Sequence, residues 1–65
     1  MVIRINGERR EVSPGLSLGR LLETLAVPEF CAVAVNRVCI PRHARDETPV
    51  TEGDEVEILV PQPGG

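Results

Sequence analysis

Hydrophobic and polar residues alternate at the start of the chain. Ile3 and Ile5 share one face of a predicted strand, and Asn6-Gly7 is the dipeptide typical of a tight hairpin turn. The return segment, residues 8–12, is mostly charged, and charge on a strand discourages pairing with a further strand. We therefore expect a first hairpin whose second strand lies at the edge of a sheet.

The hydrophobic period changes in the next segment, where leucines recur at intervals of three and four residues. This spacing places them on one face of a helix, with Ser17 as the expected N-cap and Pro28 helping to stop it. A helix of about ten residues is too short to persist alone in water, so its apolar stripe must pack on a sheet. The stripe consists of Leu18, Leu21, Leu22 and Leu25.

Three further segments complete the pattern. Residues 31–36 alternate again, and residues 38–40 form a short partner strand across a two-residue turn, which pairs residue 35 with 38 and 34 with 39. Residues 42–49 form a polar connection with room for one helical turn. The last strand, around Val56, has one apolar face, and we expect it parallel to the first strand at the centre of the sheet.

One short helix with a single apolar stripe and a sheet with one apolar face can each bury that surface only against the other. This arrangement gives a two-layer α+β domain. The order of elements predicts the β-grasp architecture, with a mixed sheet of four to five strands packed on one short helix. We place this domain at residues 1–60.

Residues 61–65 follow the last strand and contain no side chain suited to a core. Their two prolines favour an extended path, so we expect a flexible C-terminal tail. Gly64 and Gly65 have no Cβ, and the Gly65 carboxylate could therefore enter a slot too narrow for a side chain. Acyl chemistry on a carboxylate requires activation, typically by ATP, and the chain has no phosphate-binding loop of its own. We expect a group carrier that a partner enzyme activates.

Several short motifs occur in a characteristic order. They are Asn-Gly-Glu at 6–8, Val-Ala-Val-Asn at 33–36, Ile-Pro-Arg at 40–42, Glu-Gly-Asp-Glu-Val-Glu-Ile at 52–58 and Gly-Gly at 64–65. In this order and at this chain length they resemble the ubiquitin-like sulfur carriers, in particular the ThiS family of thiamine biosynthesis. The resemblance covers essentially the whole chain.

This resemblance implies a carrier with no catalysis and no cofactor of its own. A ThiF-like, ATP-dependent E1-like adenylyltransferase would adenylate Gly65, and a cysteine desulfurase or rhodanese-like protein would supply sulfur to form a thiocarboxylate. A ThiG-like thiazole synthase would then accept the sulfur. Gly64 would fit the narrow slot. The candidate docking residues next to the tail are Ile58, Val60, Pro61 and Pro63.

Other functions of the same fold stay open. The proline-rich segment 60–63 also resembles the tail of the molybdopterin carrier MoaD, and a carrier for tRNA thiolation shares the same chemistry. A protein modifier joined through Gly65 to lysines of its targets, or an interaction module with an inert tail, is also consistent with the pattern. The short chain and the Ile-Pro-Arg segment at 40–42 favour thiamine biosynthesis.

Composition narrows the partners. Seven basic residues against ten acidic ones give a net charge of −3, and Phe30 is the single aromatic residue, so nucleic acid is not an expected ligand. The apolar runs are too short to span a membrane, and the chain begins in a strand pattern without a signal peptide, which leads us to expect a cytoplasmic protein.

The remaining reactive side chains point to no second site. Cys31, Cys39 and His43 are too few for a closed zinc site, so we expect no metal, two cysteines that are buried or half-buried, and a solvated histidine. A disulfide is disfavoured because the expected register places the two cysteines on opposite faces. An acidic group near the last strand either faces a basic patch of the activating enzyme or is a solvated strand face. Its members are Glu52, Asp54, Glu55 and Glu57.

Overall fold

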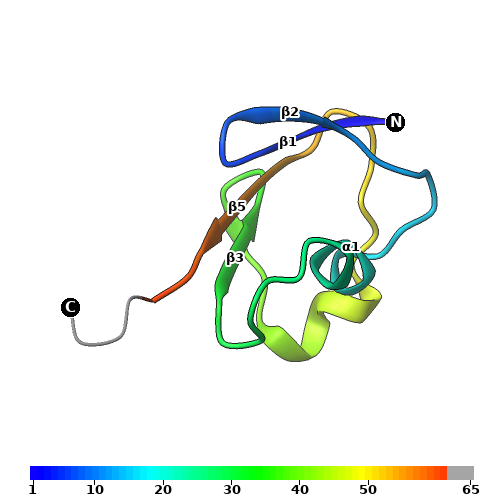
Figure 1. The fold of residues 1–65 in the computed structure, drawn as a ribbon. Coiled ribbons are helices and arrows are strands. Elements are labelled where there is room, and N and C mark those ends of the chain that lie inside the picture. Colours follow the sequence, from blue (N-terminus) through cyan, green and yellow to red (C-terminus); the bar gives the residue numbers. More distant parts are fainter. Residues whose placement is uncertain (62–65) are drawn as a thin grey trace.

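The computed structural model describes residues 1–61, and within them the strands form one mixed sheet (Figure 1). Along the chain the elements are β1 (Val2–Ile5), β2 (Glu8–Glu11), α1 (Leu18–Thr24), β3 (Ala32–Val35), β4 (Val38–Cys39), the 3-10 helix η1 (Arg42–Glu47) and β5 (Glu55–Leu59). The order of strands across the sheet is β2-β1-β5-β3-β4. The predicted β-grasp architecture is confirmed, with all five strands that the sequence allowed.

The sheet centre has the expected arrangement. β1 and β5 pair in parallel, with Ile5 beside Val56, and both residues belong to the core. β2 pairs antiparallel with β1 at the edge, and all four of its residues are exposed. Apolar alternation therefore fixes the central strands, and the charged strand takes the position where no further strand pairs with it.

Helix α1 is shorter than predicted. Its N-cap is Ser17, as expected, whose hydroxyl accepts a hydrogen bond from the Arg20 N–H at 3.2 Å. The helix ends after seven residues because Ala26 adopts a left-handed backbone conformation with φ of 57°. Leu25 is therefore the C-cap residue, and Pro28 lies beyond the end of the helix rather than at it.

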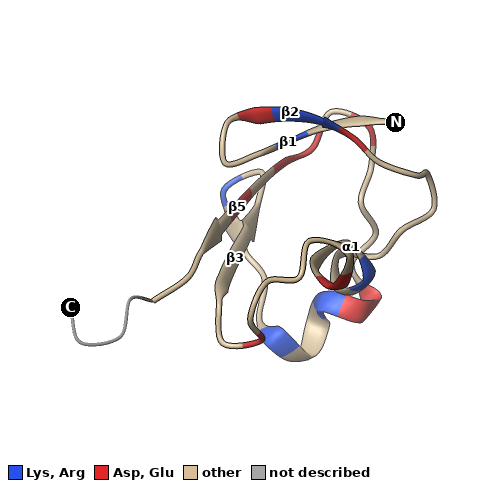
Figure 2. Cartoon of the chain, viewed as in Figure 1, with Lys and Arg blue, Asp and Glu red and all other residues tan. Residues whose placement is uncertain are grey.

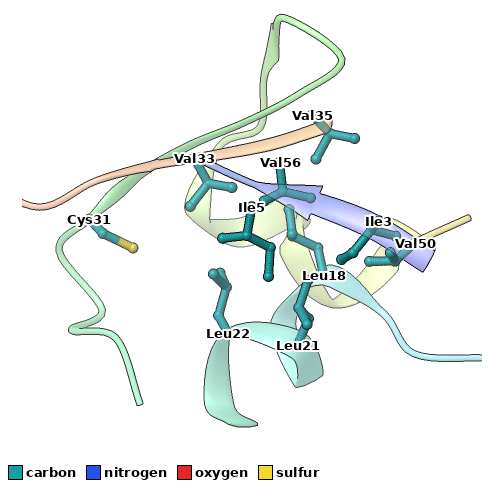
Figure 3. Packing of buried hydrophobic residues seen from close by; sticks show 10 residues of the cluster. All are labelled: Ile3, Ile5, Leu18, Leu21, Leu22, Cys31, Val33, Val35, Val50 and Val56. Atoms are coloured by element: carbon teal, nitrogen blue, oxygen red, sulfur yellow. The ribbon is translucent and has the colours of Figure 1, made fainter. Parts of the chain in front are cut away.

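The core lies between α1 and one face of the sheet (Figure 3). Leu18 and Leu21 have no exposed surface, and each such side chain stabilises the fold by about 1.5–3 kcal/mol relative to an exposed one. The leucine stripe thus packs on the sheet as predicted. The buried hydrophobic residues are Ile3, Ile5, Leu18, Leu21, Leu22, Cys31, Val33, Val35, Val50 and Val56.

The β3–β4 hairpin has the predicted register, with Val35 opposite Val38 and Ala34 opposite Cys39. Cys31 is buried, but Cys39 is exposed, so the expectation that both thiols are buried or half-buried was wrong for Cys39. The physical reason is the register itself. Cys39 lies beside Ala34, on the face of the sheet turned away from α1.

The polar connection after β4 contains η1 and one buried charge. Arg45 is 8% exposed, and its guanidinium donates hydrogen bonds to the carbonyl oxygens of Glu29 and Cys31 at 3.2 and 2.6 Å. These bonds hold the loop that leads into β3. The sequence predicted only a polar connection with room for one helical turn, and Arg45 was not singled out.

Candidate functional site

The C-terminal end of β5 exposes apolar surface. Leu59 is 72% exposed, more than the other exposed large hydrophobic residues, Phe30 and Val38. Its neighbours Ile58 and Val60 are half-buried and pack against the core. Leu59 therefore faces away from α1, since successive side chains of a strand point to opposite faces of the sheet.

Small side chains next to Leu59 leave a shallow hollow on this outer face. Ala32 lies opposite Leu59 in β3, and Ala34 lies between Glu57 of β5 and Cys39 of β4. All of these residues line the hollow. Figure 2 shows that β3 and the far end of β5, from which the chain leads to residue 61, are free of charge. We call this surface, formed by Ala32, Ala34, Cys39 and Leu59, the apolar end patch.

The rest of the outer face is charged. Arg4 of β1 lies opposite Arg9 of β2 on one side and Glu55 of β5 on the other, and all three residues are exposed. Glu57 continues the charged row along β5. The outer face is thus divided between a charged region over β2, β1 and the start of β5 and the apolar end patch over β3, β4 and the end of β5.

A buried polar cluster holds the start of β5. Asp54 is 7% exposed, and its carboxylate accepts hydrogen bonds from the Thr51 N–H at 2.8 Å, the Thr51 hydroxyl at 2.9 Å and the Asn36 amide at 3.0 Å. Burial raises the pKa of Asp54, but these hydrogen bonds outweigh it, so the pKa lies below its ordinary value. For Asp54 both interpretations of the acidic group were wrong, because a buried carboxylate neither belongs to a solvated face nor faces a partner.

The end of β5 is held by the side chain of Asn6. Its amide nitrogen donates to the Ile58 carbonyl at 3.1 Å, and its amide oxygen accepts from the Ile58 N–H at 2.7 Å. One side chain thus satisfies both backbone groups of the residue beside Leu59. Asn6-Gly7 was predicted only as a turn, and its contact with β5, 52 residues away, had no signal in the local sequence.

The predicted site residues fall into two groups. Pro63, Gly64 and Gly65 lie outside the described residues. Ile58, Val60 and Pro61 lie where the chain leaves β5, with Pro61 exposed. Leu59 was not predicted as a site residue. The sequence does contain an indication of it, because the alternation of β5 predicts a polar residue at this outward-facing position and Leu59 is apolar. The outward-facing residues before it are Glu55 and Glu57.

The described part of the chain was also searched for metal sites and for membrane-spanning helices. Residues 1–61 contain no group of three or more His, Cys, Asp or Glu side chains that could hold a metal ion, and His43 is exposed on η1. Among the same residues no helix is long and apolar enough to cross a membrane. The apolar end patch and the tail that follows it remain the candidate site.

Comparison with known proteins gives one consistent result. The model of the ThiS family matches residues 3–65. The crystal structure of the thiamine biosynthesis protein ThiS from Geobacter metallireducens is similar over 100% of both chains, with 35% identity and a TM-score of 0.86. A solution structure of a thiamine biosynthesis protein from the same organism matches all of this chain and 88% of that one, with 35% identity and a TM-score of 0.82. No curated protein matched.

The family model covers residues 3–65, and the similarity to the crystal structure covers both chains completely at 35% identity. The chain belongs to the ThiS family.

Proposed function

We propose that this protein is a sulfur carrier of thiamine biosynthesis that works through the carboxylate of Gly65. The observation that carries the proposal is the family match, which continues through the tail to residue 65 and is accompanied by end-to-end similarity to a ThiS protein. The division into a domain at 1–60 and a tail at 61–65 is part of the proposal. The domain provides recognition, and the tail presents the reactive group.

The chemistry begins with activation by a ThiF-like, E1-like enzyme. The Gly65 carboxylate attacks the α-phosphorus of ATP and displaces pyrophosphate, which forms an acyl-adenylate. The terminal sulfur of a persulfide, carried by a cysteine desulfurase or rhodanese-like protein, then attacks the acyl carbon and displaces AMP. A second thiol cleaves the resulting S–S bond, is oxidised to a disulfide, and leaves the thiocarboxylate on Gly65.

Gly64 has a steric role in this scheme. The active site of an adenylating enzyme must exclude water from the acyl-adenylate, which favours a narrow entrance. A residue without a Cβ before the reacting carboxylate can pass through such an entrance, whereas a larger side chain would contact its walls.

The apolar end patch is the proposed docking surface for the activating enzyme and for a ThiG-like thiazole synthase. Leu59 is the exposed anchor, and the small side chains of Ala32 and Ala34 leave a hollow that can receive a side chain of the partner. The patch adjoins Val60 and Pro61, through which the chain leaves β5. A partner bound there would therefore have the tail within reach.

The carrier role is tested by the mass of the protein isolated from its own cells, followed by fragmentation of its C-terminus. Replacement of one oxygen by sulfur at Gly65 is the expected result. The fragment is required because oxidation of Met1 changes the intact mass almost identically. Incubation with the E1-like enzyme and ATP, followed by thiazole synthase and its substrates, then tests the pathway.

Each outcome of this experiment points to one function. A thiocarboxylate that thiazole synthase consumes supports the proposal, whereas a thiocarboxylate used only by a molybdopterin synthase or a tRNA-thiolating enzyme would reassign the pathway. Adducts joined to lysines of other proteins would identify a modifier. An unchanged Gly65 after treatment with the E1-like enzyme and ATP would overturn the proposal.

A further inference from the structure

The backbone groups of β5 alternate between its two neighbouring strands. Glu55 accepts a hydrogen bond from Asn36, on the side of β3, and Val56 accepts one from the Asn6 N–H at 2.9 Å, on the side of β1. Ile58 follows two residues later and therefore directs its N–H and carbonyl towards β1. β1, however, ends at Ile5.

The chain turns away from β5 where those two groups need partners. Asn6 and Gly7 have φ angles of 50° and 84°, which start the hairpin to β2. Continuation of the parallel ladder would have brought a backbone carbonyl and a backbone N–H of β1 to Ile58. The side-chain amide of Asn6 supplies an equivalent acceptor and donor, at 2.7 and 3.1 Å.

We propose that Asn6 is a positioning residue: its side chain extends the β1–β5 ladder past the end of β1 and thereby fixes the direction in which the tail leaves the domain. On the opposite side, Ala32 pairs with Leu59. Both sides of β5 are thus held immediately before Val60 and Pro61. This inference depends on the proposed function, because the direction of the tail matters only if Gly65 must enter another protein's active site.

Residue type explains why asparagine is suited to this position. Asparagine tolerates a left-handed backbone conformation and carries both a hydrogen-bond donor and an acceptor. Glycine tolerates the conformation but offers neither group. Aspartate offers only the acceptor and would place its charge against the Ile58 carbonyl oxygen.

The chain provides a matched control at the other end of β5. Asn36 also adopts a left-handed conformation, with φ of 51°, and its side chain also bonds β5, accepting from the Glu55 N–H at 3.0 Å and donating to Asp54. It lies at the start of the strand, away from the tail. Loss of its side chain should therefore weaken the fold without redirecting the tail.

The experiment compares Asn6→Gly with Asn36→Gly, because glycine keeps both turns and removes both side chains. Thermal unfolding first establishes that each variant is folded at the assay temperature. Hydrogen exchange is then followed at two backbone amides. Exchange of the Ile58 amide should be faster in Asn6→Gly only, and exchange of the Glu55 amide should be faster in Asn36→Gly only.

Adenylation by the E1-like enzyme, measured with ATP as exchange of pyrophosphate, gives the functional comparison. We expect Asn6→Gly to lower kcat about tenfold with little change in KM, because Leu59, Ala32 and Ala34 are unchanged in this variant but the carboxylate is misdirected. Asn36→Gly should leave both constants within about twofold of the wild type, since it spares the tail end of β5.

The outcomes separate the inference from the proposed function. If the wild-type chain is not adenylated, the proposed function fails, and exchange at Ile58 still decides whether Asn6 holds the strand end. If the wild type is adenylated and the two glycine variants have equal kcat, Asn6 has no positioning role. Unchanged exchange at Ile58 in Asn6→Gly would equally overturn the inference.

Discussion

The two ends of β5 use the same device for different purposes. At each end an asparagine in a left-handed turn bonds the strand through its side-chain amide: Asn36 at the start and Asn6 at the finish. At the start the surroundings are polar, and the buried Asp54 accepts three hydrogen bonds. At the finish the surroundings are apolar, and Leu59 is exposed.

This difference separates stability from recognition along one short strand. A buried carboxylate with three hydrogen bonds stabilises the fold and leaves no group for a partner. An exposed leucine beside a shallow hollow contributes little to folding but can be buried by a partner. Changes at the C-terminal end of β5, around Leu59, should therefore affect the reaction. Changes at its N-terminal end, around Asp54, should affect folding.

The largest expected effect lies in the tail. Deletion of Gly65, or replacement of Gly64 by phenylalanine, should abolish adenylation, because the first removes the reacting residue and the second obstructs its entry into a narrow site. Neither change should move the thermal unfolding transition. A large loss of stability on deletion would show that the tail packs on the domain, and would contradict its proposed role.

Truncation of a core side chain should have the opposite effect. Leu21→Ala removes a side chain with no exposed surface and should lower the free energy of unfolding by about 2–5 kcal/mol, as measured by urea titration. The fraction that remains folded should be adenylated at the wild-type rate. Slower adenylation of that folded fraction would mean that the core also shapes the docking surface.

Substitution of Leu59 tests the role of the C-terminal end of β5 directly. Leu59→Glu should lower kcat/KM for adenylation by about tenfold to a hundredfold, because a buried charge would replace an apolar contact in the complex. Phe30→Glu is the matched control, since Phe30 is 67% exposed but lies in the loop between α1 and β3. Equal losses in both variants would argue against the apolar end patch as the docking surface.

Most of the fold could be predicted because the periodicity of the sequence determines which face of each element is buried. Alternation at Ile3 and Ile5 identified a central strand, and the leucine spacing identified the helix that covers it. The length of the helix could not be predicted in this way. It depends on the left-handed conformation of Ala26, a residue whose type does not indicate one.

The candidate site was harder to predict because its contacts join distant segments. Asn6 lies 52 residues from Ile58, and Arg45 lies 14 residues from Cys31. Local patterns register neither contact. Leu59 could have been noticed as an apolar residue in an outward position, but its exposure depends on the small side chain of Ala32 that β3 places beside it, which only the sheet register reveals.

The smallest expected effect concerns Asp54 at the start of β5 and the pH dependence of the free energy of unfolding. Asp54→Asn keeps the shape of the side chain and removes the charge, so it should lower the free energy of unfolding near pH 7 by roughly 1–2 kcal/mol. The pKa of Asp54 is lower in the folded chain than in the unfolded one. The stability due to its ionisation is therefore present above the unfolded pKa and is lost as the pH falls through the folded pKa.

The difference in unfolding free energy between the wild type and Asp54→Asn should consequently shrink as the pH is lowered from 7 into the range where carboxylates are protonated, about pH 4 and below. Urea titrations of both chains at a series of pH values measure it, and the other carboxylates largely cancel because both chains contain them. Adenylation at pH 7 should be equal in the two folded proteins. A difference that stays constant or grows on acidification would mean that the hydrogen bonds at the start of β5 do not favour the ionised carboxylate. The start of β5 would then not differ from its C-terminal end by a stabilising charge.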